Sequence, residues 1–162
     1  MQNRIKVVLI GGMDGKQSFV RELRASDDNQ NNKNNGAYQY KGTIGVDFIA
    51  LNYKGRQFQV WDTAGQERFF AATKVYLKDA DAVIFIQARE EQKKAVLSNQ
   101  FTSKPLTIVD FHSEQGMTPA SCLDAVLEDL GVEVSNKQER KFVVKQERQD
   151  LVESAVEFHK GL

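Results

Sequence analysis

The sequence predicts an α/β fold with a mostly parallel central sheet, flanked by helices on both faces. Apolar, β-branched runs alternate along the chain with segments of helical periodicity, which is the pattern of such a sheet. Two of the runs are separated only by Lys54-Gly55, which predicts one antiparallel hairpin. The chain has 162 residues and no internal repeat, so we expect one domain over residues 1–162. Ligands of such folds bind at the carboxyl ends of the strands.

The first half of the chain supplies the expected central strand, a helix and the hairpin. Residues 5–10 are an apolar run and predict a buried strand. The helical segment that follows has an apolar face: Phe19, Val20 and Leu23. Residues 27–36 contain five asparagines and nothing apolar to bury, so we expect a loop. Residues 48–53 and 56–61 are the two strands of the hairpin.

The second half continues the alternation. Residues 80–86 and 106–109 read as strands, and residues 90–101 between them as a helix. Residues 142–144 predict a last short strand, and residues 151–158 a final amphipathic helix.

One helix has clear signals for its start and its end. Thr118 is a good N-cap, and Pro119 fits the first helical position. Gly131 supplies the stop. The apolar positions between them are expected on one face: Leu123, Val126, Leu127 and Leu130.

Composition excludes several classes of function. Lys and Arg together number 22, as do Asp and Glu, so a general role with nucleic acid is not expected. No apolar run reaches the length of a membrane span. The single cysteine, Cys122, lies among apolar positions and is expected to be a buried core residue. His112 and His159 are isolated, so they predict no metal site.

Two stretches carry the strongest functional signal. Residues 61–69 read WDTAGQERF and follow a strand-like run, and residues 43–48 upstream read TIGVDF. Together they resemble switch II and switch I of the small GTPases, specifically of the Rab family. The resemblance covers residues 4–86 clearly and residues 105–160 in outline. It implies a P-loop small-GTPase fold whose hairpin is the interswitch, with GTP or GDP and Mg²⁺ as cofactors.

The resemblance gives the switch residues their expected roles. Thr43 would reach Mg²⁺ and the γ-phosphate, and Asp62 would hold Mg²⁺ through water. The backbone N–H of Gly65 would contact the γ-phosphate, because glycine allows close approach. Gln66 would orient the attacking water, so a slow hydrolysis of GTP to GDP and phosphate is expected.

Residues 11–18 (GGMDGKQS) are the candidate phosphate loop. They follow a strand and open a helix, which is the required context, but the glycine spacing is one residue shorter than the standard pattern. The resemblance assigns nucleotide binding to six of them: Gly11, Gly12, Gly15, Lys16, Gln17 and Ser18.

Two alignments of this loop are open. With a one-residue deletion, Gly15-Lys16 match the family's Gly-Lys and Gln17 replaces the hydroxyl residue. Without a gap, Ser18 takes the magnesium position, and Lys16-Gln17 replace the Gly-Lys pair. Asp14 adds a negative charge near the phosphates in either case. The alternative is a glycine turn that binds nothing tightly.

Three aromatic residues match the effector-binding positions of Rab proteins: Phe48, Trp61 and Tyr76. Large, partly exposed aromatic side chains are typical interface anchors. The resemblance therefore implies Rab effector or regulator proteins as partners. The alternative is that Phe48 and Trp61 only pack the hairpin onto the core.

The base-recognition end departs from the family. The guanine-specific Asn-Lys-x-Asp motif is absent after residues 106–109. Asp110 or Glu114 would be the carboxylate for the guanine N1–H. Either residues 135–137 (SNK) or residues 146–148 (QER) would stand for the Ser-Ala-Lys motif.

The favoured function is a Rab-like GTP/GDP-dependent switch in vesicle trafficking. The alternative is a pseudo-GTPase binding module, or a Rab mimic, with weak or no nucleotide binding. The expected location is the cytoplasm, at the cytosolic face of endomembranes. Rab proteins usually end in prenylated cysteines, and residues 159–162 contain none, so membrane association is expected only if a lipidated tail has been removed.

Overall fold

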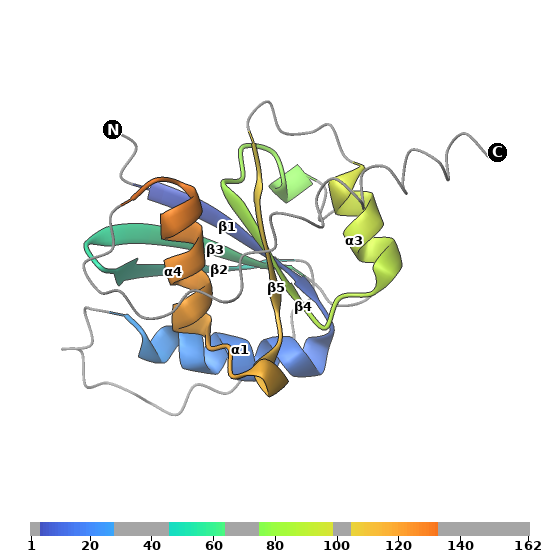
Figure 1. The fold of residues 1–162 in the computed structure, drawn as a ribbon, viewed down its shortest axis with the longest axis horizontal. Coiled ribbons are helices and arrows are strands. Elements are labelled where there is room, and N and C mark those ends of the chain that lie inside the picture. Colours follow the sequence, from blue (N-terminus) through green and yellow to red (C-terminus); the bar gives the residue numbers. More distant parts are fainter. Residues whose placement is uncertain (1–3, 28–45, 64–74, 99–104, 133–162) are drawn as a thin grey trace.

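The computed structural model describes residues 4–27, 46–63, 75–98 and 105–132. They contain a five-stranded sheet in the order β2-β3-β1-β4-β5, seen in Figure 1. β1, β3, β4 and β5 are parallel, and only β2 runs antiparallel, beside β3. The predicted fold class is confirmed. The bounds of the strands are β1 Arg4–Gly11, β2 Val46–Tyr53, β3 Arg56–Thr63, β4 Ala82–Ile86 and β5 Thr107–Phe111.

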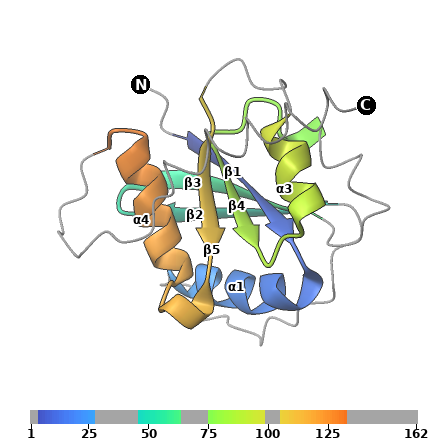
Figure 2. The ribbon, with the colours of Figure 1, turned by 45° about the vertical axis from the view of Figure 1, so that its right-hand side comes forward.

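Helices cover both faces of this sheet (Figures 1 and 2). Helices α1 and α4 pack on one face, where Leu23 and Val126 belong to the larger apolar core. Helix α3 covers the other face, where Val96 belongs to a second, smaller core. The helical bounds are α1 Met13–Ala25, α3 Glu90–Leu97 and α4 Pro119–Asp129, with a short 3₁₀ turn, η2, at Ser113–Gln115.

Strand β1 is central because both of its faces are apolar. Val7 and Leu9 point into the core under α1 and α4, whereas Val8 and Ile10 point into the core under α3. This two-sided burial is typical of a parallel strand and explains the continuous apolar run in the sequence. Figure 2 shows the arrowheads of β1, β4 and β5 at one edge of the sheet, the edge at which ligands of such folds bind.

The predicted hairpin forms around Lys54-Gly55. Both residues have positive φ, 48° and 73°, as a two-residue type I′ turn requires. Glycine adopts this conformation without strain. The side chains next to the turn reach α4: the Tyr53 hydroxyl donates to Asp124 at 3.1 Å, and Lys54 Nζ lies 2.6 Å from the same carboxylate oxygen.

Helix α4 begins as predicted. The Thr118 hydroxyl accepts the backbone N–H of Ser121 at 3.1 Å, and Pro119 is the first helical residue. The prediction was wrong for Leu130, which is 39% exposed. The helix ends at Asp129, so Leu130 is its C-cap and no longer follows the apolar stripe.

Several other boundaries differ slightly from the predictions. β4 starts at Ala82 rather than at residue 80, and β5 extends to Phe111. Helix α3 ends at Leu97. Most of the predicted loop 27–36, the strand 142–144 and the helix 151–158 lie outside the described residues.

Candidate functional site

The junction between β1 and α1 contains a single residue. β1 ends at Gly11, Gly12 is the N-cap, and α1 begins at Met13. The backbone N–H of Gly12 donates to the carbonyl oxygen of Ile86 at 3.1 Å. A Cβ atom on Gly11 would overlap that same carbonyl oxygen. The close approach of β1 to β4 therefore requires glycine at position 11, whereas Gly12 contributes its backbone N–H.

The remaining residues of the candidate phosphate loop lie in the first two turns of α1. A Cβ atom on Gly15 would come within 2.7 Å of the Gln87 side-chain oxygen, so the helix packs tightly against the end of β4. Gln17 is half-buried and Ser18 is exposed. Because successive helical residues are about 100° apart, Ser18 points away from the side on which Lys16 lies.

Lys16 is fully buried, with 0% of its surface exposed. Its Nζ lies 3.2 Å from Asp62 Oδ1 and also donates to the backbone carbonyl oxygen of Thr63. Burial lowers the pKa of the Lys16 ammonium from its usual value, and the neighbouring Asp62 carboxylate opposes this decrease. The structure thus joins the lysine of the candidate phosphate loop to the predicted magnesium ligand.

Asp62 and Thr63, the last two residues of β3, are the partners of Lys16. Asp62 is 1% exposed and stands opposite Leu9 in the parallel ladder of β1 and β3. The hydroxyl of Thr63 donates to the carbonyl oxygen of Leu9 at 2.6 Å. The role of Thr63 could not be predicted from the sequence, because this hydrogen bond depends on the pairing of β3 with β1.

This arrangement does not fit a magnesium nucleotide. A phosphate needs backbone N–H groups that wrap around it and a lysine that reaches it. Here one residue connects strand and helix, its N–H is used by Ile86, and the Lys16 ammonium lies against Asp62. The nucleotide and metal roles of residues 11–18 and Asp62 stay predictions. Thr43, Gly65 and Gln66 lie outside the described residues, so their predicted roles cannot be placed in this geometry.

The three predicted effector residues do come together. The Phe48 and Trp61 rings are 5.0 Å apart at 63°, and the Trp61 and Tyr76 rings are 5.3 Å apart at 32°. Phe48 is 44% exposed, and Val75 beside Tyr76 is 71% exposed. The Lys6 ammonium lies 5.4 Å from the centre of the Trp61 ring. We call Phe48, Trp61 and Tyr76 the aromatic surface.

The alternative of simple core packing accounts for part of this cluster. Trp61 is half-buried and packs against the smaller core under α3. Phe48 does not belong to either core and leaves almost half of its surface to solvent. A cluster that is anchored at its centre and open at its edge has the form of a preorganised binding surface.

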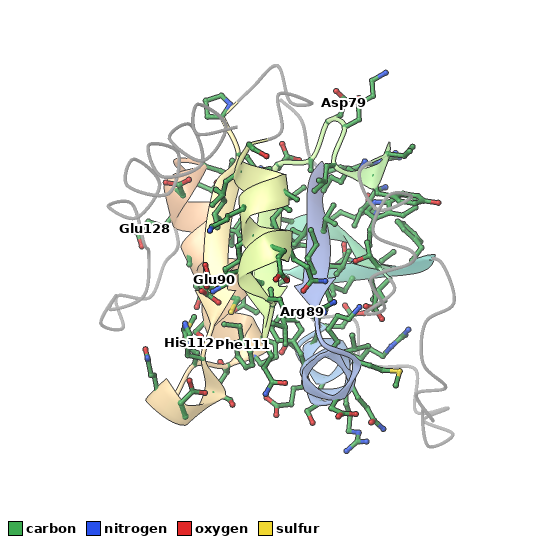
Figure 3. All side chains as sticks on the ribbon, turned by 90° about the vertical axis from the view of Figure 1, so that its right-hand side faces the viewer. Asp79, Arg89, Glu90, Phe111, His112 and Glu128 are labelled. Carbon is green, nitrogen blue, oxygen red and sulfur yellow. The ribbon has the colours of Figure 1, made fainter. Side chains whose placement is uncertain are left out.

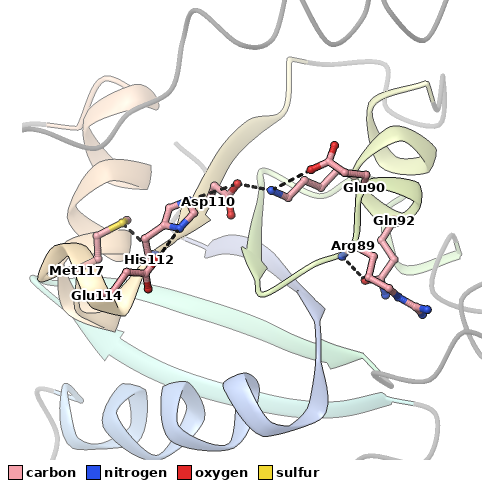
Figure 4. A network of polar contacts seen from close by, with 8 residues as sticks. Arg89, Glu90, Gln92, Asp110, His112, Glu114 and Met117 are labelled. Atoms are coloured by element: carbon pink, nitrogen blue, oxygen red, sulfur yellow. Dashed lines mark hydrogen bonds and ion pairs between the residues drawn. The ribbon is translucent and has the colours of Figure 1, made fainter.

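The carboxyl end of β5 carries a second polar cluster. Figure 3 labels Arg89, the N-cap of α3, and Glu90, its first residue, together with Phe111, the last residue of β5, and His112, which follows it. Lys93 Nζ is 2.5 Å from Asp110 and 3.9 Å from Glu90. Dashed lines in Figure 4 mark these ion pairs at Asp110 and Glu90.

His112 lies between the two carboxylates considered for base recognition. Its Nε2 is 3.6 Å from Asp110, and its Nδ1 is 3.1 Å from Glu114 (Figure 4). The Glu114 backbone N–H and the His112 ring lower the pKa of the exposed Glu114 carboxyl. Both carboxylates thus have cationic or imidazole partners within the chain. No group of three or more metal-ligating side chains occurs among the residues described.

A family model described as "Ras of Complex, Roc, domain of DAPkinase" matches residues 6–110. The chain belongs to the Roc/Ras-like family of GTPase domains. The match runs from Lys6 in β1 to Asp110 in β5, so it includes the Lys16–Asp62 contact and the aromatic surface.

Curated relatives of this GTPase domain carry Rab and Ypt names. It is 37% identical over 93 residues to the Ras-related protein Rab-13 of Mesocricetus auratus, covering 54% of this chain and 42% of the relative. It is 38% identical over 93 residues to the GTP-binding protein YPT1 of Saccharomyces cerevisiae, covering 54% and 41%. The Ras-related protein Rab-32D of Dictyostelium discoideum is 33% identical over 88 residues, covering 51% and 35%.

The matched region spans about two fifths of the length of these relatives. Together with the family match, they support a Rab-family small GTPase. Membership of this family implies guanine nucleotide binding, typically with Mg²⁺. Within the described part of the GTPase domain, no helix has the length and hydropathy to cross a bilayer.

Proposed function

We propose that this Rab-like domain acts in vesicle trafficking by binding effector or regulator proteins through the aromatic surface. The observation that carries the proposal is the assembly of Phe48, Trp61 and Tyr76 into one partly exposed cluster on β2, β3 and the segment before β4. Aromatic side chains held in place before binding lose little conformational entropy on contact with a partner. The cytosolic face of endomembranes is the location that this proposal implies.

The family relation favours a guanine-nucleotide-dependent form of this function. In that form GTP and GDP would change the conformation of the switch segments, and Thr43, Gly65 and Gln66 would sense or hydrolyse the γ-phosphate. Support comes from the Rab and Ypt relatives and from the WDTAGQERF sequence at residues 61–69.

A second candidate is a module that binds the same partners without nucleotide turnover. One observation favours it: the single-residue junction at Gly12, with Lys16 turned onto Asp62. Both candidates use the same aromatic surface. They differ only in whether nucleotide controls its contacts.

The aromatic surface is tested by binding measurements with purified Rab effector and regulator domains on a biosensor. Trp61→Ala removes the central ring, and we expect its Kd to rise by about 30-fold or more, as for a hot spot of at least 2 kcal/mol. Leu130→Ala is the matched control, because it truncates an exposed apolar side chain at the C-cap of α4, away from the aromatic surface. Equal affinities of the wild type and Trp61→Ala for every partner that binds would refute the proposal.

The nucleotide question needs a separate measurement. The purified protein is denatured, and released nucleotide is identified by ion-pair chromatography. Near-stoichiometric GDP or GTP would favour the switch, and Gln66→Leu should then slow hydrolysis while binding is retained. A protein that is empty, and stays empty when titrated with fluorescent GTP and GDP, would favour the second candidate.

A further inference from the structure

We infer that the Lys16 ammonium is a built-in counter-cation for Asp62, which holds the ends of β1 and β3 against α1 without nucleotide or a divalent cation. The single-residue junction between β1 and α1 differs from a phosphate-binding loop, and the Lys16 ammonium lies against Asp62 instead. It does not depend on partner binding at the aromatic surface, so the two ideas can fail separately.

The first support is the position of the two charges. Lys16 and Asp62 are 46 residues apart, yet their side chains meet at 3.2 Å with 0% and 1% of their surface exposed. A buried carboxylate needs an opposite charge or donors close to it, because water is excluded. Lys16 supplies this charge from within the chain. A second cation at the same oxygen would be repelled by the ammonium at short range.

The second support is that the contact joins three elements. Lys16 comes from α1, and it binds both the Asp62 carboxylate and the Thr63 carbonyl oxygen of β3. The Thr63 hydroxyl continues to the Leu9 carbonyl oxygen of β1 at 2.6 Å. A lysine that bound a phosphate would have to leave this chain of contacts.

The third support comes from the backbone around the contact. The Gly12 N–H is held by Ile86, and Gly15 lies close to the side chains of Ile86 and Gln87, where a Cβ atom would come within 3.1 Å and 2.7 Å of them. These contacts draw the first turn of α1 onto the sheet and bring Lys16 over Asp62. The glycines that suggest a phosphate loop thus support the closed junction.

The inference predicts a fold that is independent of magnesium nucleotide. Thermal unfolding of the full chain is followed by the fluorescence of Trp61, which is the only tryptophan and precedes Asp62 in β3. Samples contain excess EDTA, 1 mM Mg²⁺ with GDP, or 1 mM Mg²⁺ with GTP. We expect the Tm values to agree within about 1 °C. A ligand present at 100 times its Kd would raise the Tm by roughly 5–10 °C. A rise of that size, or a loss of structure in EDTA, would overturn the inference.

A double-mutant cycle tests the pair itself. Lys16→Met and Asp62→Asn each leave one member of the pair behind, and we expect each to lower the Tm by on the order of 10 °C. The double variant should lose clearly less than the two single losses together, because no unpaired charge stays buried. If the Tm loss of the double variant equals the sum of the two single losses within about 2 °C, the two groups are not coupled.

A matched control uses another lysine–aspartate pair of the chain. Lys54 and Asp124 are 2.6 Å apart but partly exposed, at 32% and 40%. Lys54→Met should lower the Tm by no more than about 3 °C, as expected for a surface ion pair. If Lys16→Met costs as little as Lys54→Met, Lys16 is not a structural counter-cation. If Lys16→Met does not fold, the EDTA and nucleotide comparison on the wild type still decides.

Discussion

Two polar interactions join the hairpin turn to α4, and we expect the one made by Tyr53 to contribute more to stability than the one made by Lys54. Asp124 accepts the Tyr53 hydroxyl at 3.1 Å and pairs with Lys54 Nζ at 2.6 Å through the same carboxylate oxygen. Tyr53 is buried, whereas Lys54 is exposed. The variants Tyr53→Phe, Lys54→Met and Asp124→Ala separate the two interactions.

The magnitudes differ because the surroundings differ. A hydrogen bond from a buried hydroxyl to a charged acceptor contributes about 1.5 kcal/mol at the lower end of its range. An ion pair with both members partly exposed contributes about 0.5 kcal/mol. Asp124→Ala should therefore cost about 2 kcal/mol, which lowers the Tm by roughly 4–8 °C in a chain of this size. Tyr53→Phe should account for most of that loss.

Urea unfolding of the three variants, at low salt and in 1 M NaCl, measures both contributions. The Lys54→Met loss should disappear at high salt, because screening removes the attraction between exposed charges. The Tyr53→Phe loss should persist. The reasoning is refuted if Lys54→Met costs as much as Tyr53→Phe at low salt. It is also refuted if the Tyr53→Phe loss disappears with salt.

Three further outcomes are expected. Burial raises the pKa of the Cys122 thiol to about 12, so iodoacetamide at pH 8 should not label the native protein. After denaturation it should add one group, which mass spectrometry detects as an increase in the mass of the protein. Thr118→Ala removes the N-cap of α4 and should cost about 1 kcal/mol in urea unfolding, whereas Thr118→Ser should be near neutral. Gly11→Ala should lower the Tm strongly in thermal unfolding followed by circular dichroism, because its Cβ would overlap the Ile86 carbonyl oxygen. Gly12→Ala should be tolerated, because its Cβ would lie 3.7 Å from its nearest neighbour. Equal losses of Tm in the two variants would contradict this account.

Much of the fold could be predicted from the sequence because its signals are local. The two-sided apolar run of β1, the Lys54-Gly55 turn and the Thr118-Pro119 helix start each depend on a few neighbouring residues. The helix end at Leu130 was missed, because the apolar periodicity continues by one residue beyond the last helical turn. Boundaries of this kind are commonly uncertain by one or two residues.

Of the two candidate sites, the aromatic surface could be predicted from the sequence, whereas the contact between Lys16 and Asp62 could not. The grouping of Phe48, Trp61 and Tyr76 followed from a match at three positions, and the structure brings the three rings together. The partner of Lys16 could not be predicted, because the contact with Asp62 depends on the parallel pairing of β1 with β3 and on the start of α1 two residues after Gly11. The sequence left two alignments open at this point, and neither contained an ion pair inside the domain.

The buried position of Lys16 has a consequence for chemical footprinting. Amine-reactive reagents modify lysines in proportion to their access to solvent and to their fraction of free amine. An ammonium with no exposed surface should be acylated only when the first turn of α1 separates from the end of β3. Peptide mapping of partially acetylated protein would therefore measure the rate of this opening as the rate of Lys16 acetylation. The exposed Lys54 and Lys94 supply the reference rates for lysines at the surface.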